Sequence, residues 1–164
     1  MDTAPAAALG ALLDPRVSRH AHLIVSNVGN FHTLAFRLGP GGIEGVFEHH
    51  TGEISMSQLD GFIDKLADGT LQHREVFESM GHGALMLDRA PLPSTDRWVT
   101  IVGPRRSLMR ESKHRPYFAV PFGDMMIAGC FGLLRAYADR YPEHAGLIFD
   151  SLRGSIRPAP WELL

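Results

Sequence analysis

The chain has 164 residues and a mass of 18.1 kDa, and its 45% hydrophobic and 21% charged residues are typical of one folded domain and exclude a disordered chain. Sixteen basic and 18 acidic residues give a formal net charge of −2, so charge gives no reason to expect nucleic acid or an anionic membrane as a partner. Cys130 is the single cysteine, which excludes an intrachain disulfide and a cluster held by several local thiolates. We expect a reducing, cytoplasmic compartment, because secreted domains of this size usually carry paired cysteines.

The first predicted element is a short helix rich in alanine and leucine. Asp2 or Thr3 can cap it, Pro5 suits its first turn, and Asp14-Pro15 is expected to end it. The apolar run over residues 6–13 is too short to span a bilayer, and its flank is acidic rather than basic. The sequence therefore predicts neither a membrane partner nor a signal peptide.

Three short strands with tight connections are predicted next. Residues 23–28 form an apolar run of strand length, and residues 34–38 resume the strand pattern after a break at Gly29-Asn30. A turn over residues 39–42 leads into residues 43–48, where apolar residues alternate with polar or small ones. Consecutive strands joined this closely predict an antiparallel meander.

A helix, a strand and a second helix follow the meander. Ser55 or Ser57 can cap a helix that ends at Asp68-Gly69, and residues 98–102 are predicted to form a strand. A long helix is predicted over residues 122–141. The order of meander, helix, strand and helix predicts a layered α/β domain.

The long predicted helix, with Asp124 as its cap and Pro142 as its end, has small residues on one face, namely Ala128, Gly129 and Gly132. A glycine in a helix costs about 1 kcal/mol relative to alanine, so close packing against another helix is expected. Cys130 in this apolar setting is predicted to be a buried small hydrophobe rather than a nucleophile. Residues 146–164 are expected to form a poorly ordered C-terminal tail.

Two strand ends carry groups suited to an anion. In residues 27–33, Gly29 lets backbone N–H groups approach a phosphate, and the polar side chains nearby add donors; an ordinary hairpin turn is the alternative. The loop that follows residues 98–102 carries Arg105 and Arg106, which could meet a phosphate or carboxylate, or be solvated surface arginines.

Histidines and carboxylates gather at the end of the third predicted strand. Glu48, His49, His50 and Glu53 lie within six residues and could bind a divalent metal or supply acid–base catalysis. Adjacent residues of a strand face opposite sides, so His49 and His50 cannot share an ion, whereas Glu48 and His50 can share a face. A hydrogen-bonded strand-end cluster is the alternative.

Gly81-His82-Gly83 is predicted to be a loop before the apolar residues 84–87. A histidine between two glycines suggests a close approach to a ligand or to another backbone segment. His82 could therefore add a third polar side chain to the site at the end of the third predicted strand, or be part of a tight turn.

The order of these segments resembles the second lobe of the actin, hexokinase and heat-shock-chaperone ATPases, which have a ribonuclease H-like βββαβα core. Gly29 and Thr33 resemble the phosphate-binding turn Asp-x-Gly-Gly/Thr-x-Thr of that superfamily, with Asn27 in place of its aspartate. Residues 2–10 and 128–132 resemble its two inter-lobe helices, and residues 102–104 its adenosine-contacting loop.

A closer resemblance is to a prokaryotic family labelled pyruvate formate-lyase activating enzyme. Four blocks carry it: Asn27-Val28-Gly29-Asn30-Phe31-His32-Thr33, Gly45-x-x-Glu48-His49-His50-Thr51-Gly52, Gly81-His82-Gly83 and Phe122-Gly123-Asp124-Met125-Met126. The activity in that label resembles radical S-adenosylmethionine chemistry, which needs a Cys-x-x-x-Cys-x-x-Cys site. One cysteine cannot supply that site, so no iron–sulfur cluster is expected.

The superfamily resemblance implies a single actin-like lobe over residues 1–145, the C-terminal half of a two-lobed protein, followed by the tail. It also implies ATP and magnesium as cofactors and a nucleotide or phosphorylated small molecule as ligand. The implied cofactor-binding residues are Asn27, Gly29, Asn30, His32, Thr33 and Gly103. The expected catalytic residues around the same pocket are Glu48, His50 and His82, with His49 beside them.

Two other functions stay open. One is a metal-dependent hydrolase that uses Glu48, His50 and His82. The other is a non-catalytic subunit or scaffold, in which an apolar face around Leu9, Leu12 and Leu13 is covered by another chain. The expected macromolecular partners are a missing N-terminal lobe or a second copy in a homodimer.

Overall fold

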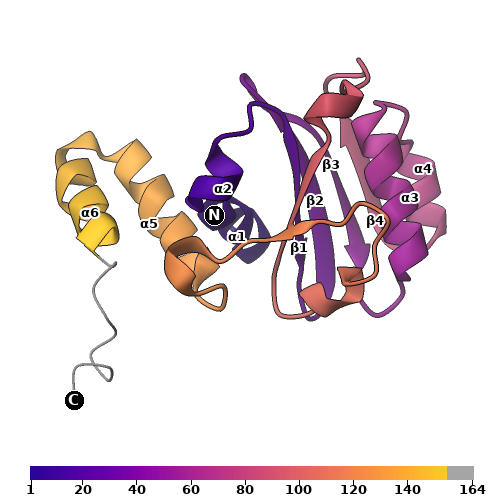
Figure 1. Cartoon of the computed structure of the whole chain (residues 1–164). Coiled ribbons are helices and arrows are strands. Elements are labelled where there is room, and N and C mark those ends of the chain that lie inside the picture. Colours follow the sequence, from indigo (N-terminus) through magenta and orange to yellow (C-terminus); the bar gives the residue numbers. More distant parts are fainter. Residues whose placement is uncertain (155–164) are drawn as a thin grey trace.

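The computed structural model describes residues 1–154 and shows a mixed α/β fold built on one six-stranded, mostly antiparallel sheet (Figure 1). The strand order is β4-β3-β2-β1-β5-β6. The first four strands pair antiparallel, whereas β5 runs parallel to β1 and β6 parallel to β5. The strands are β1 (Leu23–Val28), β2 (His32–Gly39), β3 (Gly42–His50), β4 (Gly81–Met86), β5 (Trp98–Val102) and β6 (Tyr117–Phe118).

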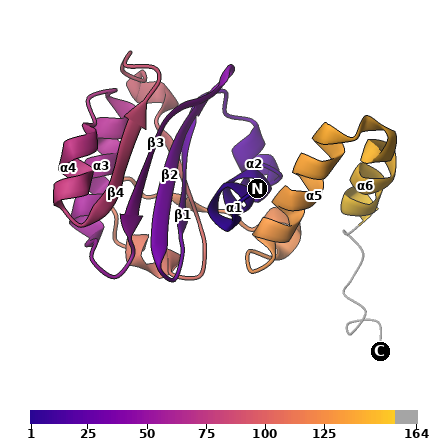
Figure 2. The same ribbon diagram turned by 180° about the vertical axis from the view of Figure 1, so that it is seen from behind.

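Helices cover both faces of the sheet, with α1 and α2 on one face and α3 and α4 on the other (Figures 1 and 2). The next helix, α5, packs against α1, and α6 packs against α5 on the side away from the sheet. The helices are α1 (Thr3–Ala11), α2 (Pro15–Ser18), α3 (Met56–Ala67), α4 (His73–Glu78), α5 (Ala128–Arg140) and α6 (Pro142–Gly154), with short 3₁₀ turns at Ser94–Asp96, Arg106–Met109 and Pro121–Gly123. Among the described residues, none of these helices is long and apolar enough to cross a membrane.

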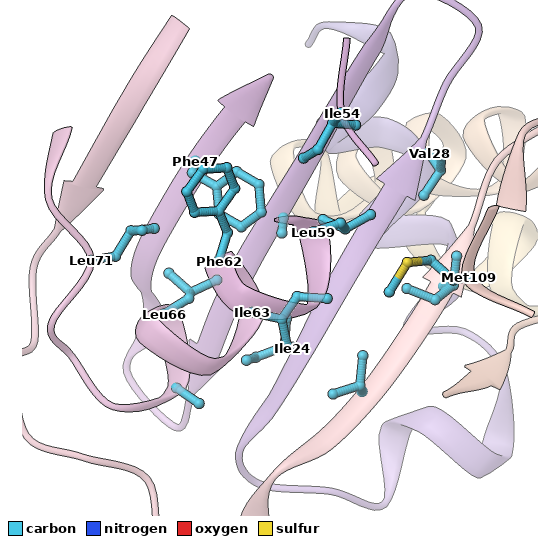
Figure 3. Packing of buried hydrophobic residues seen from close by; sticks show 14 of the residues in the cluster. Ile24, Val28, Phe47, Ile54, Leu59, Phe62, Ile63, Leu66, Leu71 and Met109 are labelled. Carbon is cyan, nitrogen blue, oxygen red and sulfur yellow. The ribbon is translucent and has the colours of Figure 1, made fainter. Parts of the chain in front are cut away.

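A separate apolar core lies on each face of the sheet. Figure 3 shows the larger one, in which side chains of α3 meet those of the strands. Burial of each large aliphatic or aromatic side chain stabilises the fold by roughly 1.5–3 kcal/mol. The larger core includes Ile24, Phe47, Leu59, Phe62, Ile63 and Leu66. The smaller core, under α1 and α2, includes Ala8, Val17, Val25, Phe36 and Val102.

Arg37, in β2, is a buried charged residue with only 2% of its surface exposed. Its Nε donates a hydrogen bond to Glu44 Oε2 at 2.9 Å, and its Nη1 donates to the carbonyl oxygen of Ala67 at 3.2 Å. A buried guanidinium is tolerated when it is paired and hydrogen-bonded in this way. These contacts link β2 to β3 and to the last turn of α3.

Asp14 joins the N-terminal helices to the segment that leads into α5. Its Oδ1 accepts a hydrogen bond from the Arg16 amide at 2.9 Å and so caps α2. Its Oδ2 accepts from Tyr117 Oη at 2.8 Å and from the Val120 amide at 3.0 Å. Burial and the hydrogen bond to the Asp14 carboxylate raise the pKa of the Tyr117 phenol.

The packing of α1 against α5 brings two backbones into contact. A Cβ on Gly10 would overlap the carbonyl oxygen of Ala128, and a Cβ on Gly132 would overlap the carbonyl oxygen of Ala6. Small residues therefore allow a closer approach than any side chain would permit. The prediction that small residues of the long helix permit close helix–helix packing is confirmed.

Several predicted elements match the structure. The strands at residues 23–28 and 98–102 have the predicted bounds, and the meander of β1, β2 and β3 is antiparallel. Asp2 caps α1. Ser55 caps α3 through a capping box with Gln58, whose side chain accepts from the Ser55 amide at 3.0 Å.

Gly81-His82-Gly83 lies in β4, so the predicted loop is wrong. These residues pair with β3 across an irregular register between Glu48 and His49. A Cβ on Gly81 would lie 2.7 Å from the His49 ring, and Gly83 has a φ of +118°. Gly81 and Gly83 therefore belong to a strand that lies very close to its neighbours. A glycine in a strand is typical of such a close approach, as it is of a loop.

The predicted helix over residues 122–141 begins later, at Ala128, because Phe122 and Gly123 have positive φ angles of 53° and 83°. Asp124 caps a turn instead, where its Oδ1 accepts from the Met126 amide at 2.7 Å. Pro142 ends α5 as predicted but also begins α6, which is helical through the first part of the expected tail. The tail's prolines, Pro158 and Pro160, lie outside the described residues.

Three short elements, α2, α4 and β6, were not predicted. Each has only two to six residues, which is too short for a periodic pattern. The apolar face expected at Leu9, Leu12 and Leu13 is half-buried rather than exposed, because α1 packs between the sheet and α5.

Gly132→Ala should lower the free energy of unfolding by about 1–3 kcal/mol, because the added methyl forces α1 and α5 apart and this overpacking exceeds the gain in helix propensity. The matched control is Gly61→Ala in α3, where a Cβ meets nothing within 4 Å and the expected change is a gain of up to about 1 kcal/mol. Urea denaturation followed by circular dichroism measures both values. Equal effects of the two substitutions would contradict the close backbone contact.

Candidate functional site

A cavity of about 620 Å³ lies where the β1–β2 turn, the loop after β5 and the first turns of α1 and α5 meet. Its wall therefore comes from segments far apart in the sequence, which the sheet and the α1–α5 contact bring together. Figures 1 and 2 show α1 between β1 and α5. Its apolar wall includes Ala4, Ala6, Met125 and Met126, and its polar wall includes Asp2, Asn27, Asn30, His32 and Glu48.

Five of the six predicted cofactor-binding residues line this cavity. They are Asn27, Gly29, Asn30, His32 and Gly103. The sixth, Thr33, is buried, and its hydroxyl lies 2.9 Å from the hydroxyl oxygen of Thr51. Thr33 is the strand neighbour of His32, so its side chain points to the opposite face of β2.

Backbone hydrogen bonds hold the two loops of the cavity in place. The Gly29 amide donates to the carbonyl oxygen of His32 at 3.0 Å and closes the β1–β2 turn. The Arg105 amide donates to the carbonyl oxygen of Val28 at 3.0 Å, which presses the loop after β5 against the end of β1. Gly103 has a φ of +107° and leaves only 2.5 Å between a Cβ and Val28 O, so glycine is required there.

The loop arginines do not contribute their charges to the cavity wall. Arg105 is exposed, and Arg106 Nη1 donates to the carbonyl oxygen of Ala119 at 3.4 Å. Val102, Gly103 and Pro104 line the cavity from this loop instead. Of the two alternatives for these arginines, the structure therefore favours surface positions.

The start of α5 faces the cavity with Ala128, Gly129 and Cys130. This helix has no side-chain cap, so amides of its first turn remain available to an anionic group. Cys130 is exposed, and the prediction that it is a buried small hydrophobe is wrong. It lies on the cavity side of α5, whereas the packing against α1 uses Gly132.

His32, His50 and His82 meet on three adjacent strands beside the cavity. Their ring centroids lie 5.1 Å apart for His32 and His50, 5.0 Å for His32 and His82, and 4.5 Å for His50 and His82. One ring nitrogen of each lies within 4.8 Å of the others. Glu48 Oε1 lies 3.5 Å from His32 Nδ1, which joins this cluster to the cavity wall.

His49 faces the opposite side of β3, as its position in the strand predicts. It is fully buried, and its Nε2 donates to the carbonyl oxygen of Ser79 at 2.8 Å. It therefore has a structural role that links β3 to the end of α4. The predicted catalytic residues Glu48, His50 and His82 are brought together around His32, without His49.

Sequence reasoning missed Cys130, Met125 and Met126 as parts of the cavity wall. The apolar neighbours of Cys130 had predicted a buried position for it. The small-residue face of α5 was the available signal, because the packing of Gly132 on Ala6 also brings the first turn of α5 against α1, beside the cavity.

Residues 1–108 match the protein family described as "Putative pyruvate format-lyase activating enzyme (DUF1786)". The chain belongs to this family. The matched region contains β1 to β5, the β1–β2 turn, the three clustered histidines and Gly103, but not α5. Comparisons with curated proteins and with solved structures give no match.

Cys130 should react with N-ethylmaleimide in the folded protein within minutes at neutral pH, since its thiol is exposed. Intact-mass spectrometry should show a single adduct, because the sequence has one cysteine. The Cys130→Ser variant, which has no thiol, is the negative control and should form no adduct. A reaction that requires urea would contradict the exposed position.

Proposed function

We propose that this family member binds a phosphorylated small molecule, with a nucleotide as the leading candidate, in the cavity between the β1–β2 turn and the starts of α1 and α5. One observation carries the proposal: five of the six residues predicted to bind the nucleotide cofactor line the same cavity of about 620 Å³. A cavity of this size suits a nucleotide-sized ligand, since pockets for small molecules typically measure 300–1,000 Å³.

The chemistry of the wall supports an anionic ligand. The uncapped first turn of α5 offers amides, and the β1–β2 turn adds the amide side chain of Asn30 and the imidazole of His32. The apolar residues of α1 and α5 would contact the uncharged part of the ligand. With its large apolar share and few convergent polar groups, the wall is typical of small-molecule sites.

The order of elements supports an actin-like lobe within this proposal. β1, β2, β3, α3, β5 and α5 follow the βββαβα order that the resemblance implies, with α4 and β4 added between α3 and β5 and the short β6 before α5. In that superfamily two lobes close around the nucleotide. We therefore expect a single lobe to bind weakly, and a second lobe or a second copy of this chain to complete the site.

Magnesium fits the cavity through oxygen donors. Mg²⁺ is usually held by one or two carboxylates together with phosphate oxygens, and Glu48 and Asp2 supply carboxylates in the wall. Asn27 stands where the resemblance places an aspartate and offers a neutral oxygen instead. When bound, the ion would neutralise phosphate charge, while Glu48 would orient or deprotonate a nucleophile.

Isothermal titration calorimetry of the full chain with ATP, ADP and inorganic phosphate, each with and without Mg²⁺, tests the proposal. Cys130→Trp should weaken nucleotide binding at least about 10-fold, because an indole at this position fills the cavity next to the start of α5. Cys130→Ser is the matched control and should bind like the wild type.

Asn30→Ala should weaken binding less than Cys130→Trp, because it removes one donor at an exposed position. Thr70→Ala, an exposed position after α3 on the opposite face of the sheet, should have no effect. No binding of any of the three ligands by the wild type, or equal binding by Cys130→Trp and Cys130→Ser, would reject this function.

A further inference from the structure

We propose that His32, His50 and His82 form a binding site for one divalent transition-metal ion, with Zn²⁺ as the representative ion. The proposal stands apart from the nucleotide proposal, because it rests on three imidazoles and requires no ligand in the cavity. Its donors also differ from those of the magnesium position, with which it shares only Glu48, since Mg²⁺ prefers oxygen donors and imidazole nitrogen suits zinc, nickel, copper or iron.

Strand pairing brings the three histidines together at one end of the sheet. His32 begins β2 and His50 ends β3, and the two are direct partners in the antiparallel register. On the other side of β3, the pairing with β4 shifts between Glu48 and His49, which are opposite Gly83 and Gly81. This irregularity sets His82 beside His50 rather than on the buried face, where His49 lies.

The spacing of the ring nitrogens is close to that of a three-histidine site. In a tetrahedral site with Zn–N distances of about 2.0–2.1 Å, the nitrogens lie about 3.3 Å apart. In the structure they all lie within 4.8 Å of one another. Side-chain rotations would bring the three nitrogens to ligand distance, and two of the three side chains, those of His32 and His82, are exposed.

A purely structural role does not account for the cluster. His49 shows what a structural histidine looks like in this sheet: it is fully buried, and its ring donates to the Ser79 carbonyl. His32 and His82 are exposed and His50 is half-buried, and the three rings are tilted at 48°, 56° and 84° to one another rather than stacked. Exposed imidazoles that converge in this way add little stability but form an accessible nitrogen donor set.

Three imidazoles leave a coordination position open, as in catalytic zinc sites. Glu48 is the neighbouring carboxylate, with Oε1 3.5 Å from His32 Nδ1. It can orient the His32 ring or become a fourth ligand, and its negative charge favours a cation at the cluster. His32 and Glu48 also line the cavity, so the open position would lie at the margin of that cavity.

The test uses the tag-free full chain, stripped with chelator and titrated with Zn²⁺ and Co²⁺. We expect one equivalent to bind, with Co²⁺ giving the visible absorption of a four- or five-coordinate site. His50→Gln and His82→Gln should each weaken Zn²⁺ binding on the order of 100-fold, and Glu48→Gln by about 10–100-fold, the range observed for residues that orient metal ligands.

His144→Gln in α6 is the matched control, because it removes an exposed histidine far along the chain from the cluster. It should leave the affinity unchanged, and circular dichroism should show the same folded spectrum for all variants. Affinity should fall in acid, because a protonated imidazole cannot bind metal.

No binding by the wild type, or equal affinities of wild type and His82→Gln, would overturn the metal site. Metal binding without nucleotide binding would support the metal site at the three histidines and reject only the function proposed for the cavity. Nucleotide binding without metal binding would reject the metal site and leave the function proposed for the cavity standing.

Discussion

The backbone contact between α1 and α5 is the constraint on which the candidate site depends. The cavity has no wall on the α5 side unless that helix lies directly on α1, and the two helices touch where Gly10 and Gly132 lack side chains. Asp14 reinforces the same arrangement, because its carboxylate holds the segment before α5 through Tyr117 and Val120. One glycine pair and one buried carboxylate therefore bring the C-terminal part of the chain to the end of β1.

The opposite boundary of the site depends on the sheet rather than on helices. The antiparallel register fixes His32 opposite His50, and the irregular pairing of β3 with β4 adds His82. Because successive side chains of a strand alternate between faces, the same register buries His49 and Thr33 on the α3 side. The donor groups at the site are thus selected by strand position, and the strand neighbours of His32 and His50, which are Thr33 and His49, are buried.

The sequence was most informative where periodicity was long or burial continuous. The apolar strands at 23–28 and 98–102 could be predicted from their length and β-branched residues, and α3 from its helical spacing of apolar residues. The site could be predicted only in part: alternation correctly separated Glu48 and His50 from His49, but nothing local showed that Thr33 bonds Thr51 or that Cys130 is exposed. Those outcomes depend on contacts between distant segments. The glycines around His82 admitted both a loop and a closely packed strand, and only the pairing with β3 decides between them.

The family description and the chemistry of the chain point in different directions. Radical activation of the kind named in that description resembles chemistry that needs several thiolates at one iron–sulfur cluster, and this chain has one cysteine, on α5. Its nitrogen donors instead lie on β2, β3 and β4, within the region that matches the family. Nitrogen donors on a rigid sheet favour a borderline divalent ion that needs no change of oxidation state. If both proposals hold, a Lewis-acidic ion at the histidine cluster would polarise a phosphorylated ligand in the neighbouring cavity, and this chemistry involves no radical step.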